Sequence, residues 1–322
     1  KALPWERYIP ADGKFWIAKA NSVKSKLFSP SDIQSIMKKA IVERLKQVYH
    51  MEWFPEDGAQ YPIRVSILKD EVTIGLDTSG VSLHKRGYRK LTAKAPITET
   101  LAAALIMLTP WKGDRILVDP FCGSGTFPIE AAMMAADIAP GLNRSFLAEQ
   151  WTHLVPKKCW MDAAEDARYR IRNDIEPDIQ GFDIDGDVIK SARENAKLAG
   201  VEKRCHFEVA DVADFAAKPE AIVLTNPPYG ERMNTIEGAA KLARTLGQQM
   251  AEHPCAGLYA ITADMEFESH YGKRANKRRK MYNGMIPCQL YMYYEAPKFE
   301  HKAKPMPKQG FDGKRTVEFK KK

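Results

Sequence analysis

The sequence is poor in cysteine and contains no long apolar segment. Its five cysteines are odd in number and scattered, and none forms a CxxC pair or a cluster with histidine. This pattern argues against a disulfide framework and a zinc site, so we expect reduced thiols in a cytoplasmic protein and no bound metal. No apolar run approaches the roughly 20 residues that span a bilayer, and no signal peptide is found, so we expect no membrane partner.

Two common nucleotide-binding patterns are also missing around the most distinctive stretch, residues 117–126. Its glycine turn lacks the GxGxxG spacing of dinucleotide-binding proteins and the lysine of a triphosphate-binding loop. Gly123 and Gly125 have no Cβ, so the backbone can turn sharply and approach a ligand. Asp119, just before the turn, would repel a pyrophosphate but can receive a cation or a hydroxyl. S-adenosylmethionine, a sulfonium nucleoside, therefore fits better than ATP or NAD.

The composition indicates about two domains and a basic C-terminal tail. A chain of 322 residues with 44% hydrophobic residues can form two sizeable cores. Residues 298–322 hold nine basic and three acidic residues, which accounts for six of the eight net positive charges. We expect this tail to be disordered and to act either as solvated charge or as a phosphate-binding segment. The sequence begins without methionine, so we expect a preceding segment.

A second basic run lies inside the predicted folded part, at residues 273–280, where six of eight residues are basic. We expect a loop, because no aliphatic face accompanies these residues. Such a dense run repels itself unless a polyanion is near, so nucleic-acid binding is favoured over solvated charge. The candidate RNA contacts are Arg86, Arg89, Lys273, Arg274, Lys277, Arg278 and Arg279.

The first 90 residues predict a small α+β domain that ends in a basic segment. Residues 14–20 are typical of a strand, and Ser29 or Ser31 can cap the amphipathic helix that follows. Alternating residues at 63–67 and 72–77 predict a hairpin. We therefore expect one domain over 1–90, with a boundary near 90–96.

The remainder predicts alternating strands and helices, and hence a mostly parallel sheet. Residues 137–178 interrupt this order as a long excursion that contains a charged helix over 162–172. We expect one domain over 91–297, with helices at 101–108, 127–135, 188–198 and 239–253 and strands at 117–119, 179–185, 205–211, 221–225, 257–262 and 289–294.

Four polar side chains stand at the predicted carboxyl ends of strands, where such sheets bind ligands. Asp183 can accept both hydroxyls of a ribose, and Asp211 can accept an adenine amine. Asp119 can order the glycine turn and face a sulfonium, while Asn226 opens a rigid turn. Each acid could instead cap the following helix, but three in register behind a glycine turn favour a nucleoside site.

Asn226-Pro227-Pro228-Tyr229 is the most specific signal in the sequence. The two prolines stiffen the turn. The Asn226 side-chain oxygen and the Pro227 carbonyl can both accept hydrogen bonds from one exocyclic amine, and Tyr229 can stack on the base that carries it. The alternative is a rigid loop with an exposed tyrosine.

Together with Asp119-Pro120-Phe121-Cys122-Gly123-Ser124-Gly125-Thr126, this turn resembles the S-adenosylmethionine-dependent amino-methyltransferases. The run through Ala132, with 139–146 and Trp151, is similar to the THUMP-containing RNA guanine-N2 methyltransferases of the bacterial 23S ribosomal RNA type. Residues 14–90 resemble the THUMP RNA-binding module, although the ferredoxin-like segment usual before it is mostly absent.

The resemblance implies a Rossmann-like fold and methyl transfer to guanine N2 in RNA. It implies cofactor contacts at Thr98, Glu99, Asp119, Phe121, Gly123, Gly125, Asp183 and Asp211, and catalytic roles for Asn226, Pro227, Pro228 and Tyr229. Transfer RNA is the alternative substrate. A DNA adenine-N6 methyltransferase and a non-catalytic RNA-binding protein remain as other classes.

Overall fold

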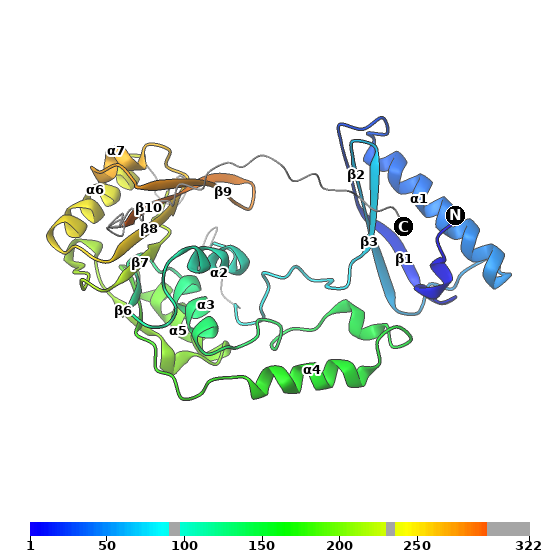
Figure 1. Cartoon of the computed structure of the whole chain (residues 1–322), viewed down its shortest axis with the longest axis horizontal. Coiled ribbons are helices and arrows are strands. Elements are labelled where there is room, and N and C mark those ends of the chain that lie inside the picture. Colours follow the sequence, from blue (N-terminus) through cyan, green and yellow to red (C-terminus); the bar gives the residue numbers. More distant parts are fainter. Residues whose placement is uncertain (90–96, 230–235, 295–322) are drawn as a thin grey trace, which may run out of the picture.

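The computed structural model describes residues 1–89, 97–229 and 236–294. A three-stranded sheet with one long helix lies at one end of the molecule, and a seven-stranded sheet with flanking helices lies at the other (Figure 1). We call these the N-terminal module (1–89) and the C-terminal module (97–294). The predicted boundary at 90–96 and the predicted disorder of the tail, 298–322, fall outside the described residues.

The elements alternate as expected. The helices, with 3-10 turns marked η, are η1 (Trp5–Arg7), α1 (Pro30–Tyr49), α2 (Glu99–Leu108), α3 (Thr126–Ala135), η2 (Leu147–Gln150), α4 (Lys157–Tyr169), α5 (Gly186–Leu198), η3 (Glu202–Arg204), η4 (Val212–Asp214), α6 (Ile236–Glu252) and α7 (Phe267–Tyr271). The strands are β1 (Lys14–Val23), β2 (Gln60–Leu68), β3 (Glu71–Leu76), β4 (Leu117–Asp119), β5 (Ile179–Asp183), β6 (His206–Val209), β7 (Ile222–Thr225), β8 (Gly257–Thr262), β9 (Lys277–Asn283) and β10 (Ile286–Tyr294). In the described ranges, every helix is too short or too polar to cross a membrane.

The N-terminal module confirms the predicted strand, helix and hairpin. β1 runs parallel to β2, and β2 pairs with β3 in antiparallel fashion. The Ser29 hydroxyl accepts the backbone N–H of Asp32 and so caps α1, whose buried stripe includes Ile33 and Ile41. β1 extends three residues beyond the predicted end, because its pairing with β2 continues to Val23.

The excursion over 137–178 leaves the large sheet and enters the core of the N-terminal module. Trp151 is 3% exposed, and its ring stacks on Tyr61 with 5.0 Å between the ring centroids. Its indole N–H donates to the Gln60 carbonyl over 2.9 Å, and the N–H of Ala148 donates to the carbonyl of Thr78. The small core is therefore completed by residues distant in the sequence.

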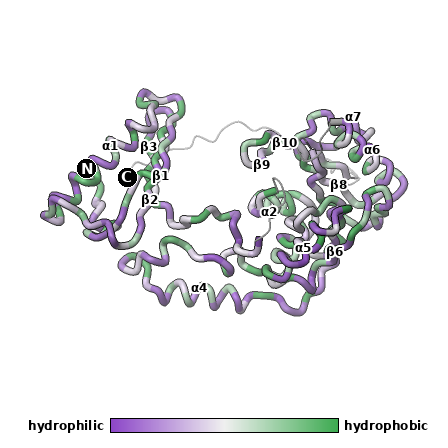
Figure 2. Tube along the Cα trace, turned by 180° about the vertical axis from the view of Figure 1, so that it is seen from behind, coloured by the Kyte–Doolittle hydropathy of each residue, from purple (hydrophilic) through white to green (hydrophobic). Residues whose placement is uncertain are grey.

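α4 follows this crossing and runs between the two ends of the molecule (Figure 1). It begins five residues before the predicted start at Asp162 and has no buried residue. Hydrophilic and hydrophobic residues alternate along it (Figure 2). α4 thus connects the modules without a core of its own.

The seven-stranded sheet has the order β6-β5-β4-β7-β8-β10-β9. The first five strands are parallel, and β10 runs antiparallel to both of its neighbours, β8 and β9, which confirms a mostly parallel sheet. α2, α3 and α5 contribute to one core cluster on the sheet, for example through Leu105, Phe127 and Ile189, while α6 and α7 contribute to the other through Leu246 and Phe267. The carboxyl ends of β4, β5, β6 and β7 therefore meet at one edge.

The predicted loop over 273–280 is wrong for its second half. Lys277 to Lys280 belong to β9, which pairs with β10 from Asn283↔Ile286 to Lys277↔Met292. β9 is the last strand of the sheet, so its basic side chains stay in water while its backbone is paired on one side. Basic residues also discourage edge-to-edge association, which explains how a strand can carry them.

Trp151→Ala tests whether the excursion over 137–178 stabilises the core of the N-terminal module. Loss of this buried, stacked indole should lower the free energy of unfolding by about 3–5 kcal/mol. Tyr169→Ala is the control, because Tyr169 on α4 is 89% exposed and should contribute less than about 0.5 kcal/mol. Urea denaturation followed by circular dichroism measures both, and equal effects would contradict a core role for Trp151.

Candidate active site

The four polar residues expected at strand ends come together at the carboxyl edge of the large sheet. Asp119 ends β4 and Asp183 ends β5, while Asp211 follows β6 and Asn226 directly follows β7. β4 pairs with both β5 and β7, and β5 pairs with β6, so the strands that carry these residues are neighbours. Within the described ranges, no cluster of three or more His, Cys, Asp or Glu side chains could hold a metal ion.

Asp119 is the most buried of the four, with 1% of its surface exposed. Its Oδ1 accepts the Thr225 hydroxyl over 2.6 Å and the Phe121 N–H over 3.1 Å. Burial raises the pKa of this carboxyl to about 7, although the two donated hydrogen bonds oppose the shift. The same oxygen thus orders the glycine turn and holds the residue just before Asn226.

Gly123 and Gly125 are required in the turn for different structural reasons. Gly123 has φ +53°, no atom of the described residues lies within 4 Å of where a Cβ would be, and its N–H donates to Asp183 Oδ2 over 3.0 Å. Gly125 has φ +82°, and its Cβ would approach the Phe207 ring to 2.9 Å. Only Gly123 therefore faces open space, and Gly125 is needed so that α3 packs closely on β6.

Asp183 and Asp211 differ in whether they cap a helix. The Asp211 side chain is exposed, and its Oδ1 accepts the Ala213 N–H over 2.9 Å, so it caps η4. α5 is capped instead by Asp185, which accepts from Asp187 and Val188. Asp183 accepts the N–H groups of Gly123 and Asp185, and burial raises the pKa of its carboxyl. Capping thus describes Asp211 but not Asp183.

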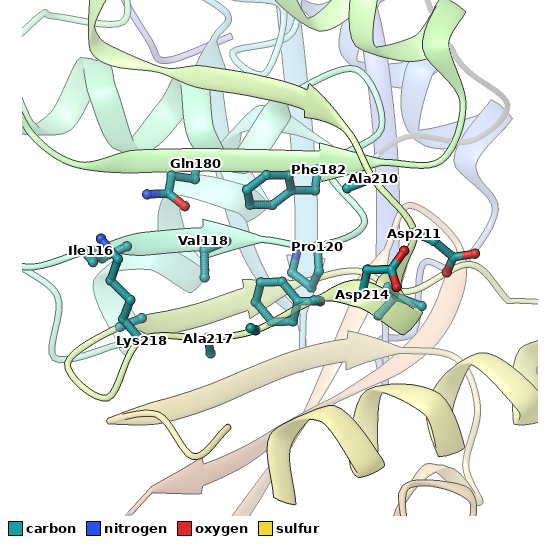
Figure 3. A pocket seen from close by; sticks show the side chains of 14 residues that line it. Ile116, Val118, Pro120, Gln180, Phe182, Ala210, Asp211, Asp214, Ala217 and Lys218 are labelled. Atoms are coloured by element: carbon teal, nitrogen blue, oxygen red, sulfur yellow. The ribbon is translucent and has the colours of Figure 1, made fainter. Parts of the chain in front are cut away.

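A hollow beside Asp211 lies on the face of β4 and β5 (Figure 3). The connection between β6 and β7 forms only the short turn η4 and no longer helix. Phe182 and Phe215 contribute rings 6.3 Å apart, and Pro120 and Val118 complete an apolar wall. The hollow offers a planar apolar group a site with a carboxylate at one end.

The Asn226–Tyr229 turn is partly buried, and residues of β9 and β10 contact its tyrosine. Asn226 is 8% exposed, and Tyr229 packs against the core cluster that contains Leu105 and Phe127. The Tyr229 hydroxyl accepts the side-chain N–H of Asn283 over 3.4 Å and lies 3.8 Å from Cys288 Sγ. Asn283 and Cys288 were missed from the sequence, where an asparagine before Gly284 indicates only a turn.

Arg86 and Arg89 were predicted to contact RNA, but their side chains are mostly buried. Their side chains are 11% and 10% exposed. Arg86 pairs with Glu130 on α3, and Arg89 pairs with Glu99 and donates to the Thr126 hydroxyl. The geometry corrects that prediction, because both guanidinium groups already bind buried acceptors and tie the end of the N-terminal module to α2 and α3.

Glu99, at the start of α2, keeps one carboxylate oxygen unused. Glu99 is 3% exposed, and its Oε2 has no hydrogen-bond partner within the described part of the chain. Thr98, at the N-cap, and Glu99 line a hollow together with Arg89 and Arg144. An unpaired buried carboxylate oxygen of this kind suits a ligand that carries an ammonium group.

The exposed basic residues near β9 divide between two faces. Lys273, Arg274, Lys277, Arg278 and Arg279 are all exposed. Arg279 lies opposite Leu290, so it shares the sheet face of Met281, Asn283 and Tyr229. Arg278 and Lys280 lie on the other face, where Arg278 pairs with Glu268 over 3.4 Å. The basic run is thus not one surface.

Two protein families match the chain. A family described as "RMKL-like, methyltransferase domain" matches residues 86–292, and the THUMP domain family matches residues 1–77. "Putative RNA methyltransferase YpsC" of Bacillus subtilis is 42% identical over 297 residues, which cover 91% of this chain and 77% of that protein. "Ribosomal RNA large subunit methyltransferase K/L" of Syntrophotalea carbinolica is 36% identical over 304 residues, and the chain spans only 42% of its length.

Solved structures show the same architecture. "SMU.472, a putative methyltransferase complexed with SAH" is 41% identical with a TM-score of 0.83, and the match covers 91% of this chain and 78% of that one. A "predicted N6-adenine-specific DNA methylase" from Listeria monocytogenes is 45% identical with a TM-score of 0.84, and the match covers 91% of this chain and 76% of that one.

Asp119→Asn tests the raised pKa. The folded protein retains the Asp119 proton up to about pH 7, whereas the pKa of an exposed aspartate in the unfolded chain is 3.8. The contribution of Asp119 to stability is therefore full below about pH 4 and is lost as the pH rises towards 7. Relative to Asp119→Asn, the wild type should lose about 4 kcal/mol across this window. Urea denaturation at several pH values measures the difference, and parallel profiles would contradict the assignment.

Proposed function

This chain belongs to the THUMP-containing, RMKL-like methyltransferase family, whose methyl donor is S-adenosylmethionine, and we propose that it methylates the exocyclic N2 of a guanine in RNA. We propose 23S ribosomal RNA as the substrate, which places the enzyme in the cytoplasm. The observation that carries this proposal is the hydrogen bond from Thr225 to Asp119, which joins the glycine turn to the Asn226–Tyr229 turn.

The residues at the sheet edge fit the donor. Asp183 suits the ribose hydroxyls, and exposed Asp211 beside the Phe182 hollow suits the adenine amine. Gly123 leaves room for close approach, with Phe121 beside it. The buried Oε2 of Glu99, which has no partner among the described residues, suits the methionine ammonium, with Thr98 next to it. When bound, S-adenosylmethionine would supply an electrophilic methyl group, and Asp119 would order the glycine turn beside it through its hydrogen bond from the Phe121 N–H.

The Asn226–Tyr229 turn would receive the guanine. The Asn226 side-chain oxygen and the Pro227 carbonyl accept hydrogen bonds from the amine, and Pro228 keeps the turn stiff. Tyr229 stacks on the base, which must leave its stack in the RNA. A bond would form between N2 and the methyl carbon while the carbon–sulfur bond breaks and its electron pair stays on sulfur, and the product nitrogen would then lose a proton to water. Because the N2 lone pair is delocalised into the ring, positioning supplies much of the rate.

Nucleoside mass spectrometry separates this proposal from its alternatives. RNA and DNA from a deletion strain are compared with those of the parent strain. Loss of one N2-methylguanosine from large-subunit ribosomal RNA supports the proposal. Loss from transfer RNA supports the second RNA substrate, and loss of N6-methyladenine from DNA supports a DNA enzyme. No change in any methylated nucleoside would favour a non-catalytic RNA-binding protein.

Asn226→Ala tests the proposed catalytic turn. The rate of methyl transfer in a single turnover should fall about 10²–10³-fold, the usual cost of removing one such positioned hydrogen-bonding group. Affinity for S-adenosylmethionine, measured by calorimetry, should be nearly unchanged. Asn21→Ala, at an exposed position of β1, is the control and should retain wild-type transfer. Near wild-type transfer by Asn226→Ala would mean that the turn is only structural.

Arg279→Gln and Lys280→Gln test which face of β9 binds RNA. The two residues are adjacent and exposed, and each substitution removes one positive charge. Only Arg279 shares the face of Tyr229, so its loss should weaken binding and reduce the dependence of log affinity on log salt by about one unit. Filter binding at several salt concentrations measures this. A larger effect at Lys280 would place the RNA on the opposite face.

A further inference from the structure

The tip of the β9–β10 hairpin exposes apolar side chains. Gly284 and Met285 form a two-residue turn closed by the pair Asn283↔Ile286, and Gly284 has φ +63°, as such turns favour. Met285 is 93% exposed and Ile286 is 40% exposed. These side chains gain nothing from the core, although a polar turn would serve the hairpin equally well.

The same tip adjoins the Asn226–Tyr229 turn. Asn283 is 8% exposed and donates its side-chain N–H to the Tyr229 hydroxyl. Ile286 lies opposite Asn283 and therefore on the same sheet face, and Met285 precedes it. The apolar tip is thus fixed beside the tyrosine on which the target base is proposed to stack.

The surroundings of the tip suit a polyanion. β9 leads into the tip with exposed Lys277 and Arg279 on the Tyr229 face. The hairpin projects from the large sheet towards the side on which the THUMP module lies (Figure 1; Figure 2 gives the opposite view). An apolar tip flanked by basic residues matches RNA, in which bases stack behind a phosphate backbone.

We propose that Met285 and Ile286 form a wedge that enters the RNA base stack in the space left by the target guanine. The wedge packs against the neighbouring bases and offsets part of the cost of unstacking, while Tyr229 receives the extruded base. Asn283 couples the two events, because it connects the tip to the Tyr229 hydroxyl. This inference rests on the proposed function and adds a base-extrusion role to the same site.

Met285→Ala tests the wedge in the full chain. The substrate is protein-free large-subunit ribosomal RNA from a deletion strain, and single-turnover methyl transfer is the readout. The rate should fall roughly tenfold, because unstacking is no longer offset by contact with the wedge. Met285→Leu, which keeps an apolar side chain of similar size, should restore most of the rate. RNA affinity and cofactor affinity should change little, because phosphate and donor contacts are retained.

Met161→Ala is the matched control, because Met161 on α4 is 70% exposed and remote from the proposed site. It should transfer methyl groups at the wild-type rate. A wild-type rate for Met285→Ala would overturn the wedge, and so would a loss of rate fully explained by weaker RNA binding. If the wild type itself methylates no RNA, the proposed function fails and the wedge fails with it.

Discussion

The active edge depends on one buried hydrogen bond, from the Thr225 hydroxyl to the Asp119 carboxylate. Asp119 ends β4 and also holds the N–H of Phe121, so it shapes the glycine turn. Thr225 ends β7 and precedes Asn226, so the same bond sets where the amine-binding turn begins. Burial of the acid is costly and raises its pKa, but it places a carboxyl group between the proposed donor and acceptor sites.

Each of the two modules packs a segment against the other, so they are not joined only by a linker. Trp151, from the excursion in the methyltransferase domain, stacks inside the THUMP core. In the other direction, buried Tyr88 and Arg86 bind Glu130 on α3. Gly87 lets the same segment lie against the 137–178 excursion, since a Cβ at this position would come within 2.1 Å of the Asn143 carbonyl oxygen. Packing therefore sets the position of the RNA-binding module relative to the catalytic edge.

In the β9–β10 hairpin, strand geometry places the basic side chains of β9 on two different faces of the sheet. Successive side chains of β9 point to opposite faces. Arg278 pairs with Glu268 on one face, while Arg279 stands on the face of Asn283 and Tyr229. A loop would impose no such division. The hairpin thus gives the Asn226–Tyr229 turn a support that also presents a basic and apolar surface.

The sequence by itself determined the order of elements, the parallel sheet and the strand-end residues Asp119, Asp183, Asp211 and Asn226. Periodicity, caps and turn residues are local signals, and parallel strands bring their carboxyl ends together by geometry alone. Only the tertiary structure decided that Arg86 and Arg89 pair with buried acids, that Gly125 serves packing, that Trp151 completes the other module and that Asn283 holds Tyr229. Each of these contacts joins residues far apart in the chain, and neither charge nor spacing along a sequence reveals which distant partner will fill the space beside a side chain.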